Sequence, residues 1–116
     1  MVKAPTTAAP EGDTEILTLP AVQPVGTLQQ VLAALADPVR LEMVRRMAQT
    51  GEPTACTLLY EGINKSTASH HFKILREAGL TERVMIGGQV HQLLRSDAVE
   101  DALPGVLASV VAATER

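Results

Sequence analysis

Two adjacent histidines, His70 and His71, occur in a segment whose residue types could bind a metal ion, transfer a proton or contact another molecule. The segment NKSTASHHFKIL, residues 64–75, reads as a helix, and neighbouring helix positions point about 100° apart. The two imidazoles therefore do not easily close on one ion or one substrate, and we expect them to have different roles. Ser69 and Cys56 supply nucleophile types, but no glycine-bearing oxyanion loop or strained turn accompanies them. We therefore expect no enzymatic activity.

The helix expected over residues 65–78 separates into an apolar face and a polar face. The apolar face should pack against the rest of the domain, with the ring of His71 partly buried and hydrogen-bonded there. The other face is short, polar and basic, and such a face suits the major groove of DNA, which is about 12 Å wide. The apolar face consists of Ala68, His71, Phe72 and Leu75. The residues of the polar face that we predict to contact DNA are Lys65, Ser66, Thr67, Ser69, His70 and Lys73.

A β-hairpin is predicted directly after this helix, because TERVMI and QVHQLL flank Gly87-Gly88. Two glycines suit a two-residue turn in which both central residues have positive φ. A polar helix face is usually only solvated, and the hairpin that follows it is what favours DNA binding. Arg83 and Gln89 are the predicted DNA contacts of this wing. Its tip, from Met85 to Gln89, carries no cation, so we expect it to bind the phosphate backbone weakly or through its amides.

An amphipathic helix of about 12 residues is predicted from Val25 onward. Its apolar residues recur at i, i+3, i+4 and i+7, which is the period of one buried helix face. These residues are Leu28, Val31, Leu32 and Leu35.

A second helix is predicted to begin at Pro38, because proline suits the first helical position and Asp37 can cap it. Gly51 should end this helix. The segment TACTLLYEG, residues 54–62, is long enough for two helical turns. Together with the helix over residues 65–78, it gives two helices joined by a short turn containing glycine, which is the helix-turn-helix pattern.

The last predicted helix begins near Ala98, since Asp97 and Glu100 have the spacing of a capping box. Pro104 lacks the amide that would bond within this helix, so it should kink or split it. The complete order is four helices, a hairpin and a closing helix. This order predicts a mainly α fold with a small β-hairpin, which is a winged helix-turn-helix.

The 116 residues are enough for one small domain between two short ends. Residues 1–24 contain four prolines and no helical period, so we expect a flexible proline-rich arm in which only EILTL, residues 15–19, could pair or pack. Residues 25–112 should form the winged domain, and residues 113–116 a C-terminal tail. A single cysteine, the lack of an apolar run near 20 residues and the lack of a signal-like leader predict a cytoplasmic protein without a membrane partner.

The net charge of −3 is unevenly distributed along the chain. Between Arg40 and Arg95, eight basic residues outnumber five acidic ones, whereas the flanking segments carry a net charge of −6. A basic centre suits an element that binds a polyanion, although ordinary solvated faces would give the same count. Arg40, Arg45 and Arg46 could add phosphate contacts, or they could instead be solvent-facing partners of Glu42.

Three strings resemble the ArsR/SmtB family of small dimeric bacterial winged-helix regulators: LADPVRLEMVRRM (35–47), INKSTASHHFKILREAGL (63–80) and TERVMIGGQVHQLLRSD (81–97). ALPGVL, residues 102–107, also looks like the closing helix of many members. The resemblance covers about residues 25–112 and implies a homodimeric DNA-binding and dimerisation domain that reads double-stranded operator DNA. The dimer contact that it implies, on the first and last helices, comprises Leu28, Val31, Leu32, Leu35, Val99, Leu103, Val106, Leu107 and Val110.

The sequence does not identify an effector. Many members of that family detect metals. A thiolate site needs three or four soft ligands, but Cys56 has no neighbouring thiol. A site on the closing helix needs paired histidines and carboxylates, but this helix has no histidine. We therefore expect that no cofactor is required. A nickel or zinc site of nitrogen and oxygen ligands could still form from His91 with Asp97, Asp101 or a carboxylate of a partner subunit. The alternative to a regulator is a winged-helix protein-interaction module with little DNA binding.

Overall fold

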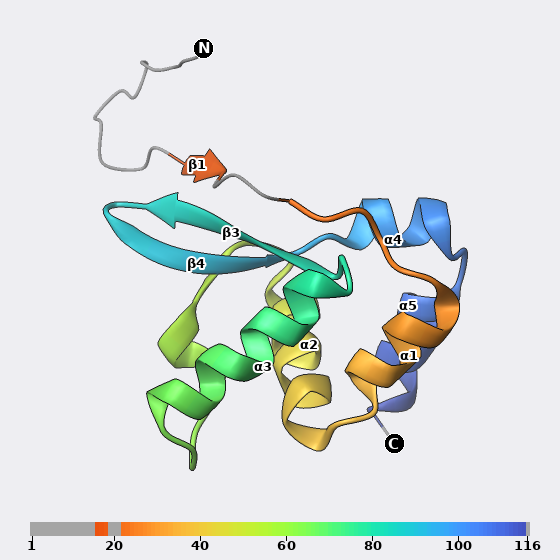
Figure 1. The fold of residues 1–116 in the computed structure, drawn as a ribbon, viewed down its shortest axis with the longest axis horizontal. Coiled ribbons are helices and arrows are strands. Elements are labelled where there is room, and N and C mark those ends of the chain that lie inside the picture. The colour runs from red at the N-terminus through yellow and green to blue at the C-terminus, as the bar shows by residue number, and fades with distance from the viewer. Residues whose placement is uncertain (1–15, 19–21, 116) are drawn as a thin grey trace.

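The computed structural model describes residues 16–18 and 22–115, so most of the predicted arm, residues 1–24, lies outside the described residues. Helices dominate the fold, and a small antiparallel sheet accompanies them (Figure 1). This confirms the predicted fold class, a mainly α winged helix-turn-helix. In chain order the elements are β1 (Ile16–Thr18), α1 (Leu28–Leu35), α2 (Pro38–Thr50), β2 (Thr54–Ala55), the 3₁₀ turn η2 (Cys56–Leu58), α3 (Lys65–Glu77), β3 (Thr81–Ile86), β4 (Gln89–Leu94), α4 (Ser96–Ala102) and α5 (Val106–Ala113).

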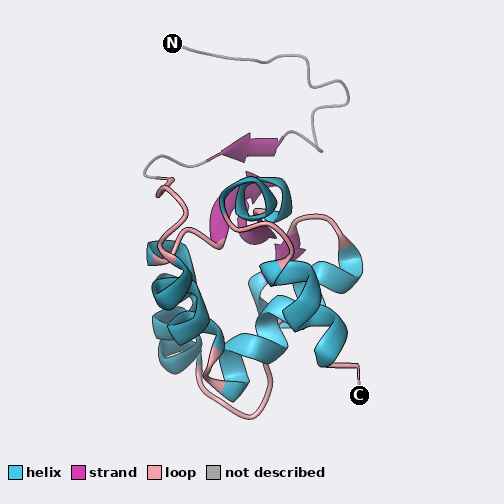
Figure 2. Ribbon diagram, turned by 90° about the vertical axis from the view of Figure 1, so that its right-hand side faces the viewer, coloured by secondary structure: helices cyan, strands magenta, loops and turns pink. Residues whose placement is uncertain are grey.

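The sheet contains the predicted hairpin and two short additional strands, in the order β1-β3-β4-β2. β3 and β4 pair along their full lengths, and Gly87 and Gly88 turn between them with φ angles of 57° and 81°. β1 pairs with the outer edge of β3, so the segment 15–19 that the sequence indicated for pairing does pair over three residues. The strands gather at one end of the molecule and most of the helices at the other (Figure 2).

Polar caps determine where the first two helices begin. The Thr27 hydroxyl accepts a hydrogen bond from the Gln30 amide at 3.2 Å, and the Gln30 side chain accepts one from the Thr27 amide at 2.8 Å. This capping box starts α1 at Leu28, so the helix has 8 residues instead of the expected 12 or so. α2 begins as predicted, because an Asp37 oxygen accepts hydrogen bonds from the amides of the next turn at 2.8 and 3.1 Å.

The segment 54–62 does not form the two helical turns that its length suggested. Its first two residues are β2, which pairs with β4 through Thr54 opposite Gln92. Only the three-residue turn η2 follows, closed by a hydrogen bond from the Leu59 amide to the Cys56 carbonyl at 3.0 Å. Strand pairing takes the residues that a helix would have used, and the first helix of the helix-turn-helix is therefore reduced to one turn.

The C-terminal helix is split as predicted, but its cap differs from the prediction. α4 ends at Ala102, Pro104 lies in the break, and α5 begins at Val106. No side chain caps the start of α4 at Ser96, so the predicted capping box is wrong. Its Glu100 carboxylate instead accepts a hydrogen bond from the Gly105 amide at 3.1 Å, so this side chain stabilises the break.

One hydrophobic core joins the helices to the base of the hairpin. Its fully buried members come from α1, α2, α3, the turns and α4. Among the described residues, no helix is long and apolar enough to cross a membrane. The buried core residues are Val31, Ala34, Leu35, Met43, Val44, Met47, Leu59, Ala68, Phe72, Leu75, Ala78, Leu80, Leu94, Val99 and Leu107.

Candidate nucleic-acid interface

α3 holds its predicted polar face away from the rest of the chain. The helix begins at the cap Asn64, whose side chain accepts a hydrogen bond from the Thr67 amide at 2.8 Å. The apolar face packs inward, with Phe72 5% exposed and Leu75 completely buried. The opposite face stays free for a partner, because its six side chains are all exposed: Lys65, Ser66, Thr67, Ser69, His70 and Lys73. Exposure is what DNA contact requires, and the contact itself stays a prediction.

The two histidines have the separate roles that their spacing predicts. His70 is exposed, whereas the His71 side chain is 13% exposed and lies beside α2. An Arg40 guanidinium nitrogen lies 3.1 Å from His71 Nδ1, and Arg40 Nε donates to the Ala34 carbonyl at 2.7 Å. Because arginine can only donate, His71 Nδ1 is the acceptor in this contact. The pair ties α3 to α2, and Arg40 is thus occupied in the interior contact.

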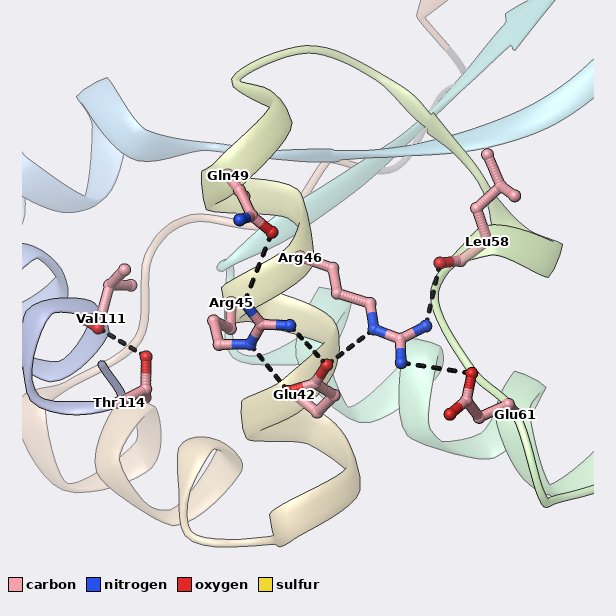
Figure 3. A network of polar contacts seen from close by, with 8 residues as sticks. All are labelled: Glu42, Arg45, Arg46, Gln49, Leu58, Glu61, Val111 and Thr114. Carbon is pink, nitrogen blue, oxygen red and sulfur yellow. Dashed lines mark hydrogen bonds and ion pairs between the residues drawn. The ribbon is translucent and has the colours of Figure 1, made fainter. Parts of the chain in front are cut away.

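Arg45 and Arg46 are partners of Glu42, which was one of the two alternatives for them (Figure 3). The Glu42 carboxylate accepts two hydrogen bonds from Arg45, both at 2.8 Å, and one from Arg46 at 2.7 Å. These bonds, only partly offset by burial, lower the pKa of Glu42 to about 2. Arg46 also donates to the Leu58 carbonyl at 3.2 Å and pairs with Glu61 at 3.5 Å. The network fastens the η2 turn to α2, and so it supports the reading helix indirectly.

The wing supplies the two remaining predicted contacts. Gln89 begins β4 at the exposed tip, and Arg83 lies half-buried in β3. Both line a cavity that also contains side chains of α3. Arg83 has no acidic partner within 4.0 Å among the described residues, so its charge is available to an incoming anion.

Two further residues of this region, Arg76 and Gln92, were not among those predicted from the sequence. Both line the cavity, Arg76 from the C-terminal half of α3 and Gln92 from β4. A signal for Arg76 was present, because Lys65, Ser69 and Arg76 are spaced at i, i+4 and i+11 and therefore share one helix side. The signal for Gln92 is strand alternation, which places it on the same face of β4 as the buried Leu94.

The residues predicted for a dimer contact divide into accessible and buried groups. On α1, Leu28 and Leu32 expose 47% and 45% of their surface. Val106 and Val110 of α5 are half-buried, and so is Leu103 in the break between α4 and α5. The remaining four residues lie on the inner side of their helices and are buried in the core of their own chain: Val31, Leu35, Val99 and Leu107. Direct contact of these four side chains with a partner subunit is therefore not supported.

The residues proposed for a nitrogen and oxygen metal site do not come together within one chain. His91 Nδ1 lies 3.1 Å from the Gln89 carbonyl, and Asp97 and Asp101 are exposed on α4. Within residues 16–18 and 22–115, no group of three or more His, Cys, Asp or Glu side chains could hold a metal ion. A site completed by a partner subunit stays a prediction.

Comparison with known proteins agrees with this geometry. Residues 35–84 match a family model described as a helix-turn-helix domain, a range that spans α2, η2, α3 and much of β3. A curated relative from Bacillus subtilis (strain 168), described as the uncharacterized HTH-type transcriptional regulator YceK, is 40% identical over 80 residues. The match covers 67% of this chain and 80% of the relative.

Proposed function

The chain belongs to the HTH-type transcriptional regulators, and from that premise we propose that it is an effector-responsive regulator of the ArsR/SmtB type that reads operator DNA as a homodimer. It is a DNA-binding protein and not an enzyme. The observation that carries the proposal is the division of α3 into a buried apolar face and an exposed face of lysine, serine and histidine. Such a face offers donors to base edges and to phosphates within one major groove.

The distribution of charge also supports DNA contact by the exposed face of α3. Glu42 neutralises much of the charge of Arg45 and Arg46 on α2, so these cations are held by the protein. On α3 and the wing, Lys65 and Arg83 have no acidic partner within 4.0 Å among the residues that the structure describes. Phosphate contacts supply most of the sequence-independent affinity for DNA, so the unpaired cations should determine which side approaches the duplex.

The exposed leucines of α1 support a homodimer. Leu28 and Leu32 are four residues apart and therefore adjacent on the helix surface, and both are large apolar side chains that are notably exposed. Covering them with a second chain would remove apolar area from water. A symmetric pair presents two copies of α3, and two readers about one helical turn apart require a palindromic site.

Selection from a pool of random-sequence DNA duplexes tests the proposal. The wild type should enrich an inverted repeat, and the double variant Lys65→Ala/His70→Ala should enrich none or a degenerate one. Ser109→Ala is the matched control, because it changes an exposed side chain of α5, away from α3, and should enrich the wild-type repeat. Failure of the wild type to retain any duplex at low salt would instead support the protein-interaction module.

A further inference from the structure

A cavity of about 540 Å³ lies between η2, α3 and the β3–β4 hairpin. Small-molecule sites usually measure about 300–1,000 Å³, so this one is large enough for a compact ligand. Its walls combine apolar side chains such as Phe72 and Val90 with a few polar ones. The reduction of the preceding helix to the single turn η2 is consistent with this hollow, because fewer side chains are available to fill it.

Two arginines line this cavity without a counter-ion. Arg76 comes from α3 and Arg83 from β3, and neither has an acidic group within 4.0 Å among residues 16–18 and 22–115. Burial lowers the pKa of Arg76, and the neighbouring positive charge of Arg83 lowers it further. Guanidinium groups that line one cavity can bind carboxylates and phosphates through charge-assisted hydrogen bonds. An anion would relieve the repulsion between them.

Gln92 gives an independent indication of a ligand. Its side chain is 2% exposed, and its Oε1 atom has no hydrogen-bond partner, although its Nε2 donates to Cys56 Sγ at 3.6 Å. A buried acceptor without a donor costs about 1–3 kcal/mol. Because Gln92 lines the same cavity as the arginines, a ligand with a hydroxyl or N–H group could supply the missing donor.

We propose that this cavity is an effector site for a small organic acid that carries a carboxylate, a compact apolar body and a hydrogen-bond donor. The carboxylate binds Arg76 and Arg83, and the donor bonds Gln92 Oε1. A phosphate of the DNA backbone is a less suitable occupant, because a phosphodiester has no hydrogen-bond donor for the unpaired Gln92 Oε1. The regulatory part of the inference rests on the proposed function.

The position of the cavity predicts how the effector acts. Lys65 and Ser69 of α3 and Gln89 of the wing line it, and these residues are also predicted DNA contacts. A bound acid places negative charge beside the surface that DNA approaches, so acid and DNA should weaken each other's binding. By linkage the two effects are equal in size.

The test is a titration of the ¹⁵N-labelled full chain, without DNA, followed by NMR. The probes are 4-hydroxybenzoate, benzoate, which lacks the hydroxyl donor, and inorganic phosphate. We expect 4-hydroxybenzoate to shift the Gln92 side-chain amide and to bind more tightly than benzoate. Arg76→Gln and Arg83→Gln should each weaken binding at least about tenfold, as the loss of a charge-assisted contact does. Arg45→Gln, which changes an arginine outside the cavity, should leave the affinity for 4-hydroxybenzoate unchanged.

Each outcome decides a separate part of the inference. The site is overturned if both aromatic acids bind with a Kd above about 10 mM, or if Arg76→Gln and Arg83→Gln bind them as tightly as the wild type does. Tighter binding of inorganic phosphate overturns the organic-acid class. Gln92→Met, with its fold checked by circular dichroism, should abolish the preference for 4-hydroxybenzoate over benzoate, and a retained preference overturns the role of Gln92.

The coupling to DNA is measured separately on a duplex obtained by selection. Saturating 4-hydroxybenzoate should weaken duplex binding several-fold in a fluorescence anisotropy titration. An unchanged DNA affinity, in a protein that binds both molecules, overturns the regulatory role alone. If the wild type binds no duplex, the proposed function fails, while the NMR titration still decides whether the cavity binds acids.

Discussion

His71 and Arg40 show how single residues hold the reading helix in place. The Arg40 side chain joins the end of α1, through the Ala34 carbonyl, to the His71 ring on α3. The Arg40 backbone amide also donates to the Asp37 carboxylate, which caps α2. Burial raises the pKa of the Asp37 carboxyl, but hydrogen bonds from the amides of Arg40 and Val39 bring this pKa below its ordinary value. His71 therefore serves the interior, which leaves His70 free on the outer face.

Glu42 gives a prediction at the same scale. Its folded-state pKa of about 2 lies below the ordinary 4.5, so its pairing with Arg45 and Arg46 stabilises the fold above pH 4.5 and ceases to do so as the pH falls towards 2. The Glu42 side chain is 39% exposed, so solvent screening limits the effect, and Glu42→Gln should cost about 1 kcal/mol or less at neutral pH. Urea unfolding at pH about 7 and about 2.5 measures this difference.

The control for this prediction is Glu77→Gln. Glu77 lies 4.0 Å from Lys73, and both side chains are 62% exposed, so its removal should change stability little at either pH. A loss for Glu42→Gln that stays constant between neutral and acid solution would contradict the assigned role of the carboxylate.

At the scale of elements, the junction between α3 and the wing depends on Gly79. This residue has a φ of +80°, and an added Cβ would overlap the Pro24 carbonyl and lie 2.5 Å from the Val25 Cα. The backbone before α1 therefore crosses directly over the end of α3, where the Gly26 amide also donates to the Ala78 carbonyl at 2.9 Å. Arg95 reinforces the crossing by donating to the Gly79 carbonyl at 2.8 Å.

Gly79→Ala should consequently destabilise the protein by about 3 kcal/mol or more, because backbone strain and a clash with backbone atoms add together. Gly51→Ala is the matched control. Gly51 has a similar φ of +69°, but nothing lies within 4 Å of its Cβ position, so the cost should be about 1 kcal/mol. Thermal unfolding of both variants measures the difference, and equal losses would argue against the close crossing.

Elements that depend on local chemistry were predictable from the sequence. Asp37 and Pro38 cap and start α2 with groups only a few residues apart, and Gly87-Gly88 needs only its own φ angles to turn the hairpin. The strand β2 was missed because it depends on the pairing of Thr54 with Gln92 and of Ala55 with His91, which lie far along the chain from it. A helix was the natural expectation for that segment, since no local signal distinguishes it from one.

The candidate site was predictable to a similar extent. Helical periodicity alone separates the outer face of α3, with Ser69 and His70, from the buried Phe72 and Leu75. The cavity could not be predicted, because it requires η2, α3 and β4 to meet in space. Strand alternation places Gln92 on the same face as the buried Leu94, but the cavity beside it depends on that packing of distant elements.

At the scale of the whole molecule, the fold combines a reading helix, a weakly charged wing and exposed leucines on α1. The wing tip carries no cation, so most of the attraction to phosphate should come from α3 and from Arg83 at the base of the wing. Leu28 and Leu32 offer the surface through which a second copy would place a second α3 on the same duplex. The central claim is that the outer face of α3 enters the major groove, once in each half-site.

Dimethyl sulfate footprinting on a selected duplex tests this claim most directly. The reagent methylates guanine N7, which lies in the major groove, and adenine N3, which lies in the minor groove. We predict that the wild type protects guanine N7 in two clusters about 10 base pairs apart, and that Lys65→Ala/His70→Ala loses both clusters together. Protection confined to adenine N3, with every guanine N7 still reactive, would show that α3 does not enter the major groove.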